Sequence, residues 1–454
     1  MTSSREIVSI MENTLLLVDD YRIDRSIRNY AQKGTLYMKK TALCPTDILL
    51  PHTDVAPSTW ACVACDQYTS QPEYWEDVDR LVGGAPSTLR LMLPECYLNE
   101  TEARVPVINQ TMLDYLNSGV LHKAVSGGYV LVERSTHSGK RIGLVGAVDL
   151  EEYDYTPGAT PLVRPTEETI AARLPARLKI RQGAAIEMSH IMMLVDDPLR
   201  TVIEPLYARR NSLRPLYDFP LMKEGGHLRG WAVEAQADLQ AISAALEQLK
   251  ARQGKDPLLF AVGDGNHSLA TAKAAWEAMK PSLAADQLED HPARFALCEV
   301  ENIHDDALTF EPIHRILTGV KPEDMMQDWI TCCQEKGMAL VEGGGSQQVQ
   351  VVCSCCEHTV GFDNPDGAIP VDTLQRYLDD YLRRHPEAEI DYIHGDDVLR
   401  DLASRENSVG FLVPPIDKST FFSAIKQLGT LPRKTFSMGH AHEKRFYMEC
   451  KKIV

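Results

Sequence analysis

The chain has 454 residues, of which 44% are hydrophobic, and it carries a formal net charge of −17 at pH 7. This length and composition suffice for two or three domains with apolar cores, while the negative charge repels phosphate backbones and anionic lipids, which speaks against nucleic acid as a partner. No apolar stretch reaches the roughly 20 residues that span a bilayer, and the N-terminus lacks a secretory signal pattern, so we expect a cytoplasmic protein that does not enter membranes.

Hydrophobic periodicity predicts alternating strands and helices along the first two thirds of the chain. Residues 1–37 show no clear capping or turn signals, so we predict that Met38 is the true start and that the segment before it is a dispensable or disordered extension. The predicted strands are 60–65, 129–133, 141–148, 191–195, 258–262 and 295–303, and the predicted helices are 72–82, 167–181, 232–252 and 269–279. This alternation predicts an α/β fold, or a mixed α+β fold, with a mixed-sheet core over residues 38–320.

The remaining residues predict a smaller C-terminal α/β portion, 321–454, that packs back on the main domain. The triple glycine at 343–345 indicates a flexible hinge near its start. The elements expected after it are strands within 349–362, a helix over 372–384, a strand-helix-strand unit over 391–413, a helix from residue 419 and a polar closing segment over 431–452.

The cysteine pattern favours free thiols. There are 11 cysteines, an odd number, and two adjacent pairs occur at 332–333 and 355–356, which does not suit a secreted disulfide framework. Cys62 and Cys65 have metal-ligand spacing, but the periodicity of a strand would point them to opposite faces, so we do not expect zinc there.

The most informative motif lies between the predicted strand 258–262 and the predicted helix 269–279. It consists of Gly263, Asp264, Gly265, Asn266, His267 and Ser268. Two glycines let the backbone approach a ligand closely, and the N–H groups and dipole of a helix N-terminus favour an anion such as phosphate or carboxylate. The motif is neither a P-loop nor the dinucleotide pattern G-x-G-x-x-G. The alternative is a tight turn in which Asp264, Asn266 or Ser268 caps the helix.

A second candidate site precedes the predicted strand 191–195. Glu187 and His190 would share a face of a helix and could bind metal, but the apolar run that follows indicates a loop entering a strand. We therefore interpret Glu187 as a candidate general base and His190 as a candidate substrate contact, with ordinary hydrogen bonding as the alternative.

Basic side chains elsewhere could complete an anion site. Arg315 follows a cluster of polar residues that includes His304, and Lys434 lies in a locally basic segment, 431–445, that could either reach the bound anion or be a solvated closing segment. The stripe of Arg173, Arg177 and Arg181 could clamp phosphate, or it could pair with nearby glutamates.

The chain resembles the domain of unknown function 1015 family (DUF1015) of bacterial and archaeal proteins. The resemblance runs in order through residues 47–51, 60–75, 181–197, the glycine loop, 310–315 and 431–449. The usual family motif, Asp-Gly-His-His-Arg, is matched by Asp264 to Ser268, with departures at Asn266 and Ser268. The motif looks like the loop of the ParB/sulfiredoxin-like superfamily, whose members include CTP-binding partition proteins, sulfiredoxins and a free-serine kinase. This resemblance implies a ligand that carries phosphate.

Three functions fit these residues. The first is a small-molecule phosphotransferase that uses a nucleotide: the backbone amides of Gly265 to Ser268 hold phosphate, Gly263 is a further ligand-binding residue, Asp264 holds Mg²⁺, and Glu187 or His267 moves the proton. The second is a noncatalytic protein that binds a nucleotide or an anionic metabolite and closes about the glycine hinge. The third is a metal-dependent hydrolase that uses Asp264, His267 and His304.

Overall fold

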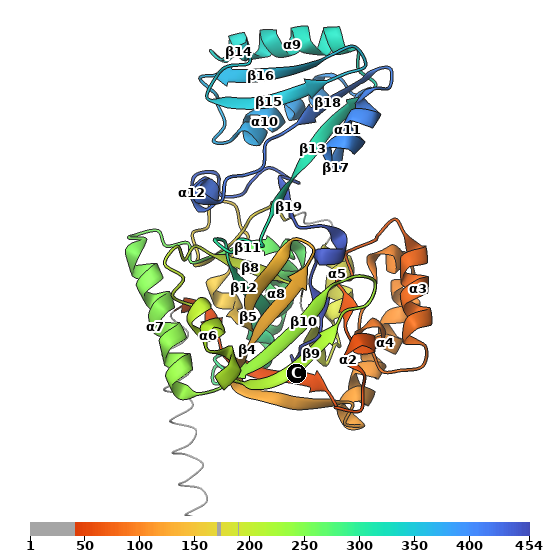
Figure 1. Cartoon of the computed structure of the whole chain (residues 1–454), viewed down its shortest axis with the longest axis vertical. Coiled ribbons are helices and arrows are strands. Elements are labelled where there is room, and N and C mark those ends of the chain that lie inside the picture. Colours follow the sequence, from red (N-terminus) through yellow and green to blue (C-terminus); the bar gives the residue numbers. More distant parts are fainter. Residues whose placement is uncertain (1–40, 170–173, 189) are drawn as a thin grey trace, which may run out of the picture.

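The computed structural model describes residues 41–169, 174–188 and 190–454, so the predicted extension over 1–37 and the start at Met38 lie outside the described residues. The fold is mixed α/β, as predicted from the alternating periods. A larger lobe contains a 12-stranded mixed sheet, and a smaller lobe at one end of the molecule contains a seven-stranded sheet (Figure 1). In the described part of the chain, no helix has the length and apolarity needed to cross a membrane.

The strand order of the larger sheet places β11, which leads into the glycine loop at 263–268, between two other strands. Its order is β6 (Val163–Pro165), β11 (Phe260–Asp264), β8 (Met192–Val195), β12 (Phe295–Asn302), β5 (Gly139–Asp149), β4 (Leu121–Thr136), β2 (Thr46–Pro51), β21 (Cys450–Lys452) and β7 (Ile186–Met188). The strand β1 (Leu43–Cys44) pairs with β5, and the hairpin of β9 (Arg214–Pro220) and β10 (His227–Val233) extends from β4. Because β11 runs parallel to β6 and antiparallel to β8, its carboxyl end meets the residues that precede β8.

Side chains that alternate along the strands pack into two apolar clusters, one on each face of the sheet. On β4, Val130 and Val132 belong to the cluster that contains Trp75, whereas Leu131 belongs to the cluster that contains Trp276. The covering helices are α2 (Pro57–Trp60), α3 (Pro72–Val82), α4 (Thr101–Asn117), α5 (Leu174–Arg181), α6 (Glu204–Ala208), α7 (Gln236–Arg252) and α8 (Asn266–Met279). Figure 1 shows α3 and α4 on one side of the larger lobe and α7 on the other.

The smaller lobe packs its sheet against amphipathic helices. Its strands are β14 (Ala339–Glu342), β16 (Glu357–Asp363), β15 (Gln347–Val352), β18 (Ser408–Leu412), β13 (Phe310–Thr318), β17 (Glu389–His394) and β19 (Phe436–Met438), and its helices are α9 (Pro322–Glu335), α10 (Pro370–Arg384) and α11 (Asp396–Ala403). The helix α12 (Lys418–Leu428) lies between the lobes, where Phe421 and Ile425 pack with Leu194 of the larger sheet. In the core of this lobe Trp329 stacks on Tyr377, with ring centroids 5.2 Å apart.

The two lobes are joined by strands and not by the triple glycine. β13 pairs with β19 at residues 310–312 and then continues into the second sheet, which therefore begins upstream of residue 321. The last strands, β20 (Phe446–Tyr447) and β21, return to the larger lobe, where β20 pairs with β3 (Cys62–Val63). Gly343 and Gly345 have positive φ angles and lie between β14 and β15, so they form a turn inside the smaller lobe.

Most predicted elements occur close to their predicted positions, and the differences have local causes. Of the predicted strand 60–65, only Cys62 and Val63 form a strand, β3, and Trp60 is the last residue of α2, which Pro57 begins. The helix predicted over 167–181 is described only from Leu174, and Glu167 instead forms a β-bridge with Leu431. The hairpin β9–β10 and the helix α9 have no counterpart among the predicted elements. All 11 cysteines are free thiols, as predicted.

Candidate functional site

The turn between β11 and α8 depends on a glycine. Gly265 is the N-cap residue of α8 and has a φ of 79°, in the left-handed region that favours glycine. A Cβ atom at this position would lie 3.0 Å from the Cα of Ile191 and 3.4 Å from the Cδ2 of His190. In the described structure no side-chain hydrogen bond caps this helix N-terminus. The first turn of α8 therefore presents its backbone N–H groups and the positive end of its dipole toward His190.

Asn266 locks this turn to the neighbouring strand end. Its Oδ1 accepts the backbone N–H of Thr166 at 3.0 Å, and its Nδ2 donates to the hydroxyl of Thr166 at 3.0 Å. The Thr166 hydroxyl in turn donates to the carbonyl of Val262 at 2.6 Å. The side chain of Asn266 is buried and these bonds occupy it, so it stabilises the loop from inside the protein.

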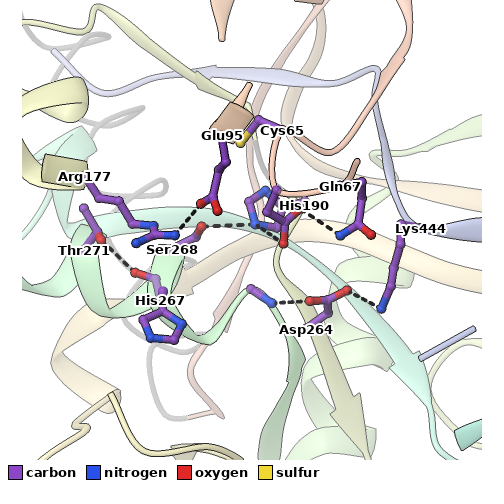
Figure 2. Close-up of polar contacts among 12 residues, drawn as sticks. Cys65, Gln67, Glu95, Arg177, His190, Asp264, His267, Ser268, Thr271 and Lys444 are labelled. Atoms are coloured by element: carbon purple, nitrogen blue, oxygen red, sulfur yellow. Dashed lines mark hydrogen bonds and ion pairs between the residues drawn. The ribbon is translucent and has the colours of Figure 1, made fainter. Parts of the chain in front are cut away.

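Asp264, at the end of β11, pairs with a lysine from the last part of the chain. Its Oδ2 lies 3.0 Å from the Nζ of Lys444, and its Oδ1 accepts the backbone N–H of Gly265 at 2.8 Å (Figure 2). Burial alone would raise the pKa of Asp264, but Lys444 and His190 lower it below the usual value. A half-buried carboxylate and a buried ammonium group thus lie beside the start of α8.

A chain of hydrogen bonds runs from Ser268 through His190 to Tyr447 and Cys65. Ser268 Oγ lies 3.1 Å from His190 Nε2, His190 Nδ1 lies 2.6 Å from the Tyr447 hydroxyl, and that hydroxyl donates to Cys65 Sγ at 3.2 Å. Burial raises the pKa of Tyr447 well above its usual value, and burial followed by the charge of Asp66 raises the pKa of Cys65 to about 12, so both keep their protons.

These protons fix the orientation of the imidazole of His190. Because the Tyr447 O–H points to Cys65, the tyrosine oxygen accepts the Nδ1–H of His190. Nε2 of His190 then accepts the hydrogen bond from the hydroxyl of Ser268. Asp66 Oδ2 lies 3.8 Å from the same nitrogen. The arrangement is a proton acceptor that faces a serine hydroxyl.

The pair of Ser268 and His190 opens on a cavity of about 160 Å³. The polar residues in its lining are Cys65, Glu95, Arg177, Arg181, Glu187, His190, Ser268, Thr271 and Tyr447. Most of the other lining residues are aliphatic or methionine side chains, and they include Leu91, Met112 and Ile180. A cavity of about this size holds a molecule as large as benzene, so it can accept a small metabolite or one end of a larger ligand.

Ion pairs inside the cavity wall involve the other acidic residues. Arg181 Nη2 donates to Glu187 Oε2 at 2.6 Å, and Glu187 Oε1 accepts the backbone N–H of Leu297 at 2.7 Å. Glu95 pairs with Arg177 on the opposite part of the lining. Glu187, predicted as a general base, therefore lines the same cavity as His190, but both of its carboxylate oxygens accept hydrogen bonds from the protein.

Two residues of the glycine loop point elsewhere. The imidazole of His267 points away from Ser268 and His190 in Figure 2, and its carbonyl accepts the hydroxyl of Thr271 at 2.7 Å. A Cβ atom on Gly263 would lie 2.3 Å from the Sδ of Met438. Close packing between β11 and β19 thus accounts for this glycine.

Arg315 and Lys434 lie toward the smaller lobe. Arg315 is fully buried, and its guanidinium donates to Gln375 Oε1 at 3.1 Å and to the carbonyl of Arg433 at 3.0 Å. Lys434 interacts electrostatically with Glu167. Burial raises the pKa of Glu167, and the positive charge of Lys434 counteracts part of that rise. The structure therefore brings Asp264, Gly265, Ser268, Glu187 and His190 together around one cavity and the adjacent helix end. Arg315 lies apart from them and forms its hydrogen bonds with Gln375 and Arg433.

Several residues of this site were not among the predicted ones. Lys444 lies in the basic segment 431–445, where Lys434 was the predicted site residue. Tyr447 belongs to β20, and Cys65 follows β3 by two residues, so the pairing of Phe446 with Val63 brings the two side chains together beside His190. The local basic charge was a signal for Lys444, whereas the sequence contained no signal for the pairing of β20 with β3.

Comparison with known proteins gives one family and several distant structures. The family model described as "Protein of unknown function (DUF1015)" matches residues 47–379. No curated protein sequence matches. A free serine kinase mutant in complex with AMP is similar to this chain at 12% identity, covering 72% of this chain and 92% of its own, with a TM-score of 0.37. A conserved hypothetical protein from Pyrococcus furiosus is similar at 11% identity, covering 67% and 90%, with a TM-score of 0.32. C-terminally truncated SbnI from Staphylococcus aureus is similar at 9% identity, covering 65% and 82%, with a TM-score of 0.34.

Proposed function

This chain belongs to the DUF1015 family, and from that premise we propose that it binds a small phosphorylated molecule or a nucleotide beside α8 and acts as a small-molecule phosphotransferase. The observation that supports this most is the meeting of three features at one place. They are a helix N-terminus led by Gly265, the ammonium group of Lys444, and the pair of His190 and Ser268 at the mouth of a cavity.

The first two features suit a phosphate group. Phosphoryl transfer depends on positioning and on neutralising negative charge more than on covalent chemistry by the protein. The N–H groups of the first turn of α8 can donate to phosphate oxygens. Lys444 is 8% exposed and lies 3.0 Å from Asp264, so its charge is held at a fixed position beside that helix end, where a phosphate group would compete with Asp264 for it.

The third feature suits proton transfer. In the proposed step, a hydroxyl oxygen of the acceptor forms a new bond to phosphorus and the bond from phosphorus to the leaving oxygen of the donor breaks. The hydroxyl proton passes to Nε2 of His190, which in this structure accepts a hydrogen bond from the hydroxyl of Ser268 at 3.1 Å, the place that the acceptor hydroxyl would take. We assign the proton acceptor to His190 because both carboxylate oxygens of Glu187 accept hydrogen bonds from the protein.

The residues around Asp264 fit Mg²⁺ only in combination with phosphate oxygens. Mg²⁺ is commonly held by one or two carboxylates together with substrate phosphates, and it would supply further neutralisation of their charge. Asp264 offers one carboxylate, which now accepts from Lys444 and from the N–H of Gly265. The roles proposed for Lys444 and His190 do not depend on this ion.

The experiment is a ligand screen followed by a turnover assay. Thermal unfolding is measured with inorganic phosphate, AMP, ADP, ATP and CTP, each with and without Mg²⁺, because a ligand that binds the native state raises its stability. The best nucleotide is then incubated with a panel of small hydroxyl compounds, and phosphoryl transfer is followed by phosphorus NMR.

Lys444→Met and His190→Gln are compared with Lys321→Met, which replaces an exposed lysine far from the site. Lys444→Met should weaken binding, and His190→Gln should keep binding but lower turnover by about 10²-fold or more. Binding that is equal in Lys444→Met and Lys321→Met would refute the assigned phosphate site. Tight binding without transfer to any acceptor would instead favour a noncatalytic binding protein.

The hydrolase alternative receives no support from the geometry. It requires Asp264, His267 and His304 to share a metal ion, but His304 Nε2 lies 2.8 Å from Asp196, and His267 points away from the cluster around Asp264 (Figure 2). Within the described residues, the group with metal-binding geometry lies elsewhere, in the smaller lobe.

A further inference from the structure

The hairpin of β15 and β16 lies in the smaller lobe (Figure 1), and three cysteine thiols meet at its turn. The Sγ atom of Cys353 lies 3.1 Å from that of Cys355 and 3.0 Å from that of Cys356, and the last two are 3.6 Å apart. All three are free thiols. Among the described residues, they form the one group of three or more potential ligands whose donor atoms all lie within 4.8 Å of one another.

The hairpin itself brings these thiols together. Val352 pairs with Glu357 in the antiparallel ladder, and the backbone N–H of Cys353 donates to the carbonyl of Cys356 at 2.9 Å. The turn therefore places the first and fourth residues of a C-x-x-C segment side by side, which is the spacing of cysteine pairs in zinc sites. Cys355 adds a third sulfur atom from inside the same turn.

We propose that Cys353, Cys355 and Cys356 bind one thiophilic metal ion, Zn²⁺ or Cu⁺, through their three sulfur atoms. Three thiolates suit these soft or borderline d¹⁰ ions. Binding converts each thiol to a thiolate, so one ion enters and three protons leave to solvent. Cys355 is exposed and the other two are partly exposed, so the ion keeps an open side from which it can be exchanged or can take a further ligand.

The adjacent cysteines of α9 show what a purely structural pair looks like. Cys332 and Cys333 are buried in the apolar cluster of the smaller lobe, together with Trp329 and Val371. The hairpin thiols belong to no such cluster: they lie at the solvent-exposed end of two strands. Apolar packing therefore accounts for Cys332 and Cys333, but it does not account for three thiols gathered on one turn.

The test uses the reduced full chain. Co²⁺ serves as the probe for a zinc site, because thiolate ligation gives an intense sulfur-to-cobalt charge-transfer absorption, and Cu⁺ is titrated in competition with a chromophoric chelator. We expect one ion per chain and the release of three protons, measured with a pH indicator in weakly buffered solution. Cys353→Ser, Cys355→Ser and Cys356→Ser should each weaken binding by at least the roughly 10- to 100-fold that the loss of an outer-shell partner costs.

The control is Cys96→Ser, which removes a partly exposed thiol in the larger lobe and should leave binding unchanged. Thermal unfolding of each metal-free variant shows whether the fold is retained. The proposal would be overturned if the wild type bound neither Co²⁺ nor Cu⁺ more tightly than the Cys353/Cys355/Cys356 triple serine variant. A preference for Cu⁺ over Co²⁺ would identify a copper site.

Discussion

The two lobes differ in where their ion pairs lie. Apart from Arg315, the core of the smaller lobe consists mainly of aromatic and aliphatic side chains, such as Trp329, Phe362 and Phe411, and ion pairs such as Arg384 with Asp328 lie at its surface. In the larger lobe an ionic network is enclosed among the strands. Glu299, Glu301, Glu449, Arg141 and Arg445 are all at most 7% exposed there.

The position of this network suggests its role. Arg445 pairs with Glu299 on β12, and its Nη2 lies 2.7 Å from Glu449 on its own segment. Its neighbours in the chain, Lys444 and Tyr447, are the residues that reach Asp264 and His190. Buried ion pairs contribute little net stability because desolvation costs about as much as the attraction returns. The comparison indicates that the larger lobe buries charge to place the segment 444–449 in register with the site.

The first and largest test removes the centre of that network. Arg445→Met leaves Glu299 and Glu449 buried without their partner, so the free energy of unfolding should fall by about 3–5 kcal/mol. Arg384→Met, at the exposed pair of the smaller lobe, should cost only about 0–1 kcal/mol. Urea unfolding of both variants measures the two losses. Equal losses would contradict the contrast between the lobes.

The second test concerns pH. Burial raises the pKa of Glu301 to about 8, with Glu299 adding to this and Arg141 opposing it. Because the folded-state pKa lies above the unfolded value, the folded protein holds an extra proton between about pH 4.5 and 8. The stability that this proton contributes is complete below pH 4.5 and is lost as the pH rises through 8. Across this window the free energy of unfolding falls by about 1.4 kcal/mol for each step of one in pH.

Glu301→Gln removes this titration from the larger lobe. As the pH rises from 5 to 8, the free energy of unfolding of the wild type should therefore fall relative to that of Glu301→Gln. Asp328→Asn in the smaller lobe provides the comparison, since Arg384 holds the pKa of Asp328 below its usual value and it has no titration in this range. A pH-independent difference for Glu301→Gln would mean that its carboxyl group is ionised throughout.

The third test separates backbone strain from ligand approach at the glycine loop. Gly265→Val should cost about 1–3 kcal/mol because φ is 79°, and it should also abolish phosphate binding, since the side chain would press on Ile191 and His190. Gly254→Val carries the same kind of strain at a φ of 73°, with nothing within 4 Å of its Cβ position. Phosphate-induced stabilisation that survives in Gly265→Val would exclude this helix end as the binding site.

The smallest effect on folding is expected at Ser268. Ser268→Ala removes the bond to His190 Nε2 and should cost about 0.5–1.5 kcal/mol, with a larger relative effect on turnover than on ligand affinity. Ser423→Ala removes an exposed hydroxyl on α12 that bonds only to the carbonyl of Thr420. Calorimetric titration with the best ligand, together with the transfer assay, measures both quantities. An unchanged transfer rate in Ser268→Ala would show that the hydroxyl of Ser268 does not lie where the acceptor hydroxyl of the substrate binds.

The sequence predicted the local parts of the fold well. Pro72 identified the start of the helix 72–82, and hydrophobic periodicity identified the unit 391–413, because these signals lie inside the segments themselves. The hairpin β9–β10 escaped prediction although its strands pair locally, because Pro215 and Pro220 lie in β9 and proline within a run argues against a strand. The helix α9 has a proline start at Pro322, but the glycines that follow it at 343–345 were interpreted as a hinge between domains.

The site was predictable where one segment supplied it. The glycine loop was recognised from its own residues, and Glu187 and His190 were identified from their place before a buried strand. Their closeness to the loop follows from the antiparallel pairing of β8 with β11, which periodicity alone does not encode. Lys444 and Tyr447 depend on the return of the chain to the larger lobe after residue 438, so single-segment patterns could not select them over Lys434.

That return sets an order on biosynthesis. All strands of the larger sheet except β21 come from residues 43–302, and the smaller lobe follows, yet Lys444 and Tyr447 reach the site only with the segment that contains β20 and β21. While the chain is still being translated, most elements of both lobes can therefore be present before His190 and Asp264 receive their partners. A polypeptide released before residue 444 would keep most of these elements and still lack the lysine and the tyrosine, so the candidate site is complete only after this segment has left the ribosome.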